Sequence, residues 1–137
     1  MTEDPKRHVA LRWSWLLVGW LLVGLVVWGC LAPAPPDLEF GLQLPQFDKL
    51  EHGGAYLLMV AWFAAALPGR GWLLFLVLAF AVLGGLIEIL QYMTGWRDGD
   101  WWDWAADCAG IVLAVGYPTR WLSNLHQRYL TIHVPAR

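Results

Sequence analysis

The sequence predicts an all-α integral membrane protein, a bundle of four transmembrane helices followed by a short C-terminal amphipathic helix on the membrane surface. The 137-residue chain is 58% hydrophobic and contains eleven tryptophans, far more than an ordinary soluble domain of this size. Its apolar residues gather in four long runs, and most basic residues fall where one side of the bundle would lie. At this length we expect a single domain, residues 1–137.

The first apolar run, 13–32, contains Ser14 as its one clearly polar residue and is long enough to cross a hydrocarbon core about 30 Å thick. Basic residues precede the run, so a cleaved signal peptide with a processing site at 32–34 is an alternative. The run is long for a signal peptide, and Pro35 would directly follow the cut. An uncut first helix is therefore the preferred interpretation.

Prolines concentrated between Ala32 and Pro45 predict an outer loop after the first helix. The turn at 68–71 separates the next two runs. The later spans are expected over 48–67, 72–93 and 101–117. The tail, 119–132, places apolar residues at helical spacing opposite basic ones, which predicts an interfacial helix.

Basic residues set the orientation, because short cytoplasmic segments are enriched in Lys and Arg. Lys49 and Arg97 fall on the outer side of the expected bundle, and the other seven fall on the opposite side: Lys6, Arg7, Arg12, Arg70, Arg120, Arg128 and Arg137. Both termini are therefore expected in the cytoplasm. Tryptophans at the predicted helix ends suit headgroup depth, so their abundance needs no ligand.

Two classes of protein are disfavoured by composition. A formal charge of -2 leaves no broad basic surface for nucleic acid. The two cysteines, Cys30 and Cys108, lack metal-motif spacing, and their different expected depths argue against a disulfide between them.

Ionisable and polar residues gather near the outer ends of three predicted helices. Asp48, His52 and Tyr56 share one helical face, as do the aspartates that open the fourth helix. An ionised carboxylate in lipid costs at least about 2.5 to 3.5 kcal/mol, so these faces should turn towards one another or towards a wet cavity. The candidate functional cluster is Asp48, Lys49, His52, Tyr56, Glu88, Gln91, Arg97, Asp100, Asp103 and Asp107.

A purely structural role for the cluster is the main alternative, with Arg97 paired to an aspartate and His52 bonded to Asp48 or Asp103. Taken singly, Lys49 fits a helix-end residue that extends its charge to the interface. The excess of carboxylates argues against structure alone. A raised carboxyl pKa, a cationic substrate group or a divalent cation would neutralise it, with Glu88, Asp103 and Asp107 as candidate metal ligands. Small residues along the fourth helix, including Ala106 and Gly110, predict a close approach to a neighbouring helix.

These residues resemble the motifs of the VanZ-like membrane proteins. The resemblance covers about 48–116 and comprises Asp48-Lys49-Leu50-Glu51-His52 with Tyr56, Glu88-Ile89-Leu90-Gln91, and then Arg97, Asp100, Asp103, Asp107 and Gly110. One departure is Asp107, where the family often has Asn. The resemblance implies a multi-pass protein of the bacterial cytoplasmic membrane, in a family whose founding member is associated with low-level teicoplanin resistance. It does not imply a particular reaction.

Two functional hypotheses follow. In the first, the outer cluster binds an envelope component or a glycopeptide antibiotic. In the second, the protein is an enzyme acting on a lipid headgroup or lipid-linked precursor, with Glu88 or Asp103 as general base or metal ligand, His52 as acid/base and Arg97 as an anion clamp. Proton or ion movement is a third alternative that rests on Glu88 alone.

Overall fold

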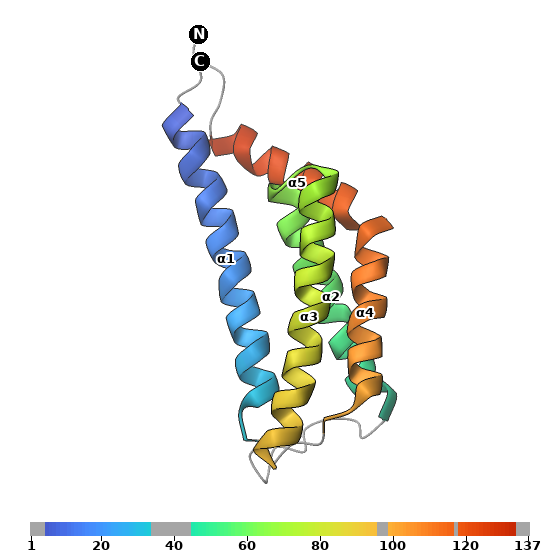
Figure 1. Ribbon diagram of the computed structural model, residues 1–137. Coiled ribbons are helices and arrows are strands. Elements are labelled where there is room, and N and C mark those ends of the chain that lie inside the picture. Colours follow the sequence, from blue (N-terminus) through green and yellow to red (C-terminus); the bar gives the residue numbers. More distant parts are fainter. Residues whose placement is uncertain (1–4, 34–44, 96–98, 117, 134–137) are drawn as a thin grey trace.

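The computed structural model describes residues 5–33, 45–95, 99–116 and 118–133, and within these ranges it contains five α-helices and no strand. They are α1 (Pro5–Leu31), α2 (Pro45–Ala66), α3 (Arg70–Thr94), α4 (Trp101–Gly116) and α5 (Pro118–His133). Figure 1 shows α1 to α4 running alternately up and down, with α5 across the end where α1 begins. The all-helical prediction is confirmed, and the main difference from the expected ranges is that α1 begins at Pro5 rather than at Trp13.

Two of these helices can cross a membrane by length and composition. They lie at His8–Leu31 within α1 and at Arg70–Thr94, and their mean hydropathies are 2.1 and 2.7. The other two bundle helices differ: α4 has only 16 residues, and the first turns of α2 are polar. Among the described helices, α1 and α3 are therefore the two whose apolar stretches are long enough to cross a membrane.

Glycine forms both boundaries of α3. Gly69 precedes the helix with φ 123°, and Gly95 follows it with φ 74°. Side chains with a Cβ rarely adopt such positive φ values, so glycine permits the tight turn from α2 and the left-handed end of the helix. The predicted turn near Pro68 is thereby confirmed.

A reciprocal pair of tryptophans joins α1 to α2. The Trp15 indole N–H donates to the Trp62 carbonyl at 3.1 Å, and the Trp62 indole N–H donates to the Trp15 carbonyl at 3.0 Å. The rings stack with centroids 4.1 Å apart and planes 11° from parallel. Both indole donors are satisfied at a helix contact, which removes the cost of burying them.

The closest approach in the bundle is between α2 and α4. A Cβ added at Gly110 would overlap the carbonyl of Gly53, and one added at Gly53 would lie 3.1 Å from the Ala106 carbonyl oxygen. The absence of side chains lets the two backbones touch, as the small residues of the fourth predicted helix indicated.

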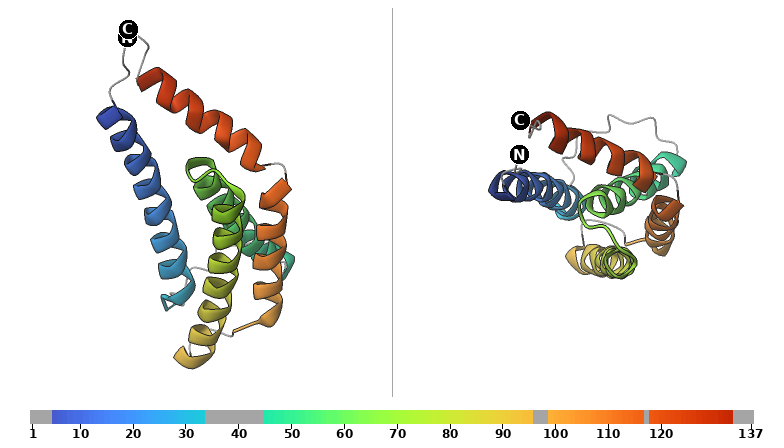
Figure 2. Two further views of the ribbon diagram at one scale, coloured as in Figure 1. Left: turned by 45° about the horizontal axis from the view of Figure 1, so that its top comes forward. Right: turned by 90° about the horizontal axis from the view of Figure 1, so that it is seen from above.

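The last helix, α5, packs its apolar face onto the bundle. Leu122 and His126 are buried, and Leu125 and Tyr129 are partly buried against the core. Figure 2 shows α5 crossing above α2, and it contacts α1 and α4 as well. The predicted C-terminal helix is therefore confirmed, and its apolar side covers the end of the bundle. Its expected position on a membrane surface stays a prediction.

Candidate functional site

Those residues of the predicted polar cluster that the structure describes meet at the end of the bundle opposite α5. This is where α2 and α4 begin and where α3 ends (Figure 1). Glu88, Gln91, Asp103 and Asp107 are all buried. Burying charged and polar side chains costs free energy unless they have hydrogen-bond or ion-pair partners, so the partners of these four residues are described in turn.

Lys49 joins the start of α2 to the start of α4. Its Nζ donates to Asp103 Oδ1 at 2.7 Å and to Asp100 Oδ2 at 2.9 Å. Lys49 is therefore in contact with other members of the predicted cluster, because its ammonium group is held by two carboxylates. This pairing also compensates much of the negative charge for which Arg97 was the predicted partner.

Asp100 organises the beginning of α4. Its Oδ1 accepts the backbone N–H of Trp102 at 2.9 Å, and its carbonyl accepts the N–H of Asp103 at 2.8 Å. The side-chain bond caps the helix at the position where N–H groups lack intrahelical partners. The Lys49 ammonium group and the Trp102 N–H together lower the pKa of Asp100, so this carboxylate stays ionised at neutral pH.

Glu88 connects α3 to the same helix start. Its Oε2 accepts the backbone N–H of Asp100 at 2.8 Å. The residue is only 3% exposed, and within the described part of the chain its buried Oε1 has no hydrogen-bond partner. Gln91, one turn later, donates from Nε2 to the Cys30 carbonyl at 3.0 Å and thereby ties α3 to the end of α1.

His52 and Asp107 form the inner contact between α2 and α4. The His52 Nδ1 lies 3.1 Å from Asp107 Oδ1, and Asp107 is 1% exposed. A Cβ at Gly84 would lie 2.7 Å from Asp107 Oδ2 and 3.3 Å from the hydroxyl of Tyr56. Gly84 therefore leaves room for both groups. Tyr56 is 1% exposed, and its hydroxyl has no hydrogen-bond partner among the described residues.

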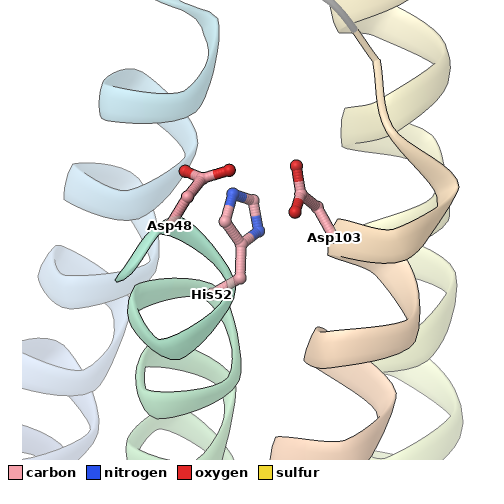
Figure 3. A group of neighbouring side chains, drawn as sticks. All are labelled: Asp48, His52 and Asp103. Atoms are coloured by element: carbon pink, nitrogen blue, oxygen red, sulfur yellow. The ribbon is translucent and has the colours of Figure 1, made fainter. Parts of the chain in front are cut away.

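Two groups of side chains have the composition and spacing of metal ligands, and they share His52. Figure 3 shows the outer group, in which the His52 ring lies between the carboxylates of Asp48 and Asp103. The inner group comprises His52, Glu88 and Asp107. In each group, one ligand atom per residue lies within 4.8 Å of the others. The set predicted from sequence, Glu88, Asp103 and Asp107, is not one of these groups, because Asp103 turns towards Lys49 and His52 lies beside Asp107 instead.

A polar cavity of about 300 Å³ opens beside these groups between α1, α2 and α3. Its polar lining includes Asp48, Glu51, His52, Tyr56 and Gln91. Glu51 was not predicted as a site residue, although it lies inside the Asp48–His52 motif and one turn after Asp48. Cys30 and Gly29 also line the cavity, and nothing in their sequence context indicated that role.

Two further sequence predictions have different outcomes. Arg97, which was expected to pair with an aspartate of α4, lies outside the described residues. Cys30 and Cys108 form no disulfide with one another, in agreement with the expectation from their different depths.

No family model, curated protein or solved structure matches this chain.

Proposed function

We propose that this chain is a multi-pass protein of the bacterial cytoplasmic membrane, with four spans and both termini in the cytoplasm. The apolar lengths of α1 and α3 support this topology. So do the exposed apolar side chains of the shorter helices, such as Leu58 on α2 and Val112 and Leu113 on α4, which lipid would cover at little cost. Lys49 is then near the outer face, and the basic residues of the opposite end face the cytoplasm.

We further propose that it is a VanZ-like protein whose outward-facing polar site binds an envelope component or a glycopeptide antibiotic, with a contribution to teicoplanin-type resistance. One observation carries this proposal: three helices place buried charged groups beside an open polar cavity at one end of the bundle. A structural network would need no such cavity, whereas a binding site requires access for its ligand.

The chemistry of the cavity favours a particular kind of ligand group. The carboxylates of Asp48 and Glu51 line it, while Lys49 is already held by two other acids. Ammonium groups and hydroxyl or amide donors would be attracted, and free anions would be repelled. Amines and amides occur in both envelope precursors and glycopeptides, so this preference fits the proposed ligand classes.

The test is glycopeptide susceptibility in cells that express the protein at matched membrane levels. The parent should change susceptibility to teicoplanin, and His52→Ala, Glu88→Gln and Asp103→Asn should lose that change together. Tyr92→Phe is the matched control, because Tyr92 is one turn beyond Glu88 on α3 but its side chain is 81% exposed. A parent that changes susceptibility while all three site variants keep full effect would contradict the assignment of the site.

A second candidate function is an enzyme that acts on a lipid headgroup or lipid-linked precursor. The observation that favours it is the clustering of His52 with carboxylates in groups that resemble metal sites. In this function His52 would act as acid/base and Arg97 would clamp an anionic group of the substrate. Purified protein incubated with labelled membrane lipids should then release a product detectable by mass spectrometry, and the Glu88→Gln protein should release none.

A further inference from the structure

We propose that His52, Glu88 and Asp107 bind one divalent transition-metal ion, with Zn²⁺ as the best-matched probe. The inference rests on the proposed function, because it names the chemistry of the same site. It assigns the ion to the inner group of side chains, buried beside the outer polar cavity.

The three side chains come from three different helices and converge on one point. His52 is on α2, Glu88 on α3 and Asp107 on α4, and their ligand atoms lie within 4.8 Å of one another. Zinc binds His nitrogen and carboxylate oxygen at about 2.0 to 2.2 Å, which separates neighbouring ligand atoms by roughly 3 to 4 Å. Small side-chain movements would close the group around an ion without moving the backbone.

The second observation is the state of the Glu88 carboxylate. Its Oε2 is held by the Asp100 N–H, which fixes the direction of the group. Its Oε1 is buried and has no hydrogen-bond partner among the described residues. Glu88 is only 3% exposed, so solvent does not supply the missing partner. A buried carboxylate oxygen without a donor is costly, and a bound cation supplies the missing partner.

Charge balance points the same way. In the described part of the chain, Lys49 is the basic side chain at this end of the bundle, and it is held by Asp100 and Asp103. Among the described residues, Glu88 and Asp107 therefore share their group with His52 and with no Lys or Arg side chain. When His52 binds an ion through a deprotonated ring nitrogen, it and the two carboxylates match a doubly charged ion.

The outer group is a weaker site for the same ion. Lys49 already binds Asp103 Oδ1 at 2.7 Å, so an ion there would have to displace an ammonium group. Asp48 is exposed, which leaves it hydrated when no ion is bound. Both features lower the gain from binding relative to the inner group.

The ligand set also selects the class of metal. Imidazole favours zinc and its neighbours, whereas Ca²⁺ and Mg²⁺ prefer all-oxygen sites. Three protein ligands leave a further coordination position open, as in catalytic zinc sites. His52, one of the three ligands, also lines the polar cavity.

The experiment measures metal binding to the full-length, tag-free protein in mild detergent. Protein stripped with a chelator is titrated with Zn²⁺, and bound metal is measured by mass spectrometry after gel filtration. The parent should bind a single zinc ion per chain. Glu88→Gln and Asp107→Asn should each weaken binding by at least about tenfold, while Asp48→Asn, which removes a carboxylate from the outer group, should bind like the parent.

X-ray absorption of the zinc-loaded parent provides a readout that depends on no variant. One imidazole nitrogen and oxygen ligands are expected, and sulfur ligation would overturn the assignment. The proposal is also overturned if the parent binds no zinc, or if Asp48→Asn loses the ion while Glu88→Gln and Asp107→Asn retain it. A metal-free parent that still changes teicoplanin susceptibility would refute the metal site and leave the proposed binding function standing.

Discussion

Lys49 and Asp103 lie 54 positions apart in the chain, yet their side chains meet at 2.7 Å. The contact aligns the first turn of α2 with the first turn of α4 at the end that carries the candidate site. Asp103 has a side chain that is only 10% exposed, so the Lys49 ammonium group is a major source of compensation for its charge.

Removing this ammonium group should destabilise the protein. In Lys49→Met the stem of the side chain is retained while Asp100 and Asp103 lose their shared partner, so the melting temperature in detergent should fall by a few degrees. Lys49→Arg should recover part of the loss, because a guanidinium group can also bind two carboxylates. Equal melting temperatures for the parent and Lys49→Met would show that these ion pairs contribute nothing to stability.

The Trp15–Trp62 pair should behave as a coupled unit. Replacing either residue with Phe removes one indole donor and weakens the stacking, at a cost of about 0.5 to 1.5 kcal/mol for each lost hydrogen bond. The double variant should cost less than the sum of the single variants, since the two residues share one contact. Unfolding in mixed detergent measures all four proteins, and Trp28→Phe is the control because Trp28 is 68% exposed. Additive effects would contradict the coupling.

A side chain at Gly110 should separate α2 from α4. Gly110→Leu would collide with the Gly53 backbone and is expected to cost about 1 to 3 kcal/mol or more of the free energy of unfolding. Gly116→Leu is the matched control, because a Cβ at that position of α4 meets no atom within 4 Å. If both variants have the same melting temperature, α2 and α4 are less closely packed at Gly110 than the structure indicates.

Stability should fall in acid because of His126 on α5. Burial and the positive charge of Arg12 lower the pKa of His126 below its usual 6.5, while the Ala65 backbone opposes them. The folded state therefore binds fewer protons than the unfolded state, and stability should decline as the pH falls below about 6.5. His126→Phe keeps an aromatic ring beside Trp15, whose centroid is 4.8 Å from that of His126. Melting temperatures from pH 8 to pH 5 should fall less steeply for this variant than for the parent, and parallel curves would rule out the contribution of His126.

The sequence predicted the helices well because each depends on a local signal. Apolar runs, prolines and the turn at Pro68–Gly69 are visible within a few residues of the boundary that each one sets. Helical spacing likewise placed Asp48, His52 and Tyr56 on one face, and all three line the polar cavity. The all-helical fold required no knowledge of distant contacts.

The pairing inside the site was not predictable from the same signals. Periodicity shows which residues share a face but not how far one helix is shifted along another, and this shift decides that Lys49 meets Asp103 while His52 meets Asp107. The hydrogen bond from the Asp100 backbone N–H to Glu88 is still harder to predict, because any residue except proline would offer that donor at position 100. The cavity residues Gly29 and Cys30 were not predicted either, because they belong to no pattern of polar side chains.

The contact between Gly53 and Gly110 has a consequence for how such a site can change. Gly53 is next to His52, and Gly110 is one turn from Asp107, so the spacing of the two helices at the site is set by main chain against main chain. An exchange of Asp107 for Asn would then alter the charge of the site and leave the separation of the helices to this main-chain contact.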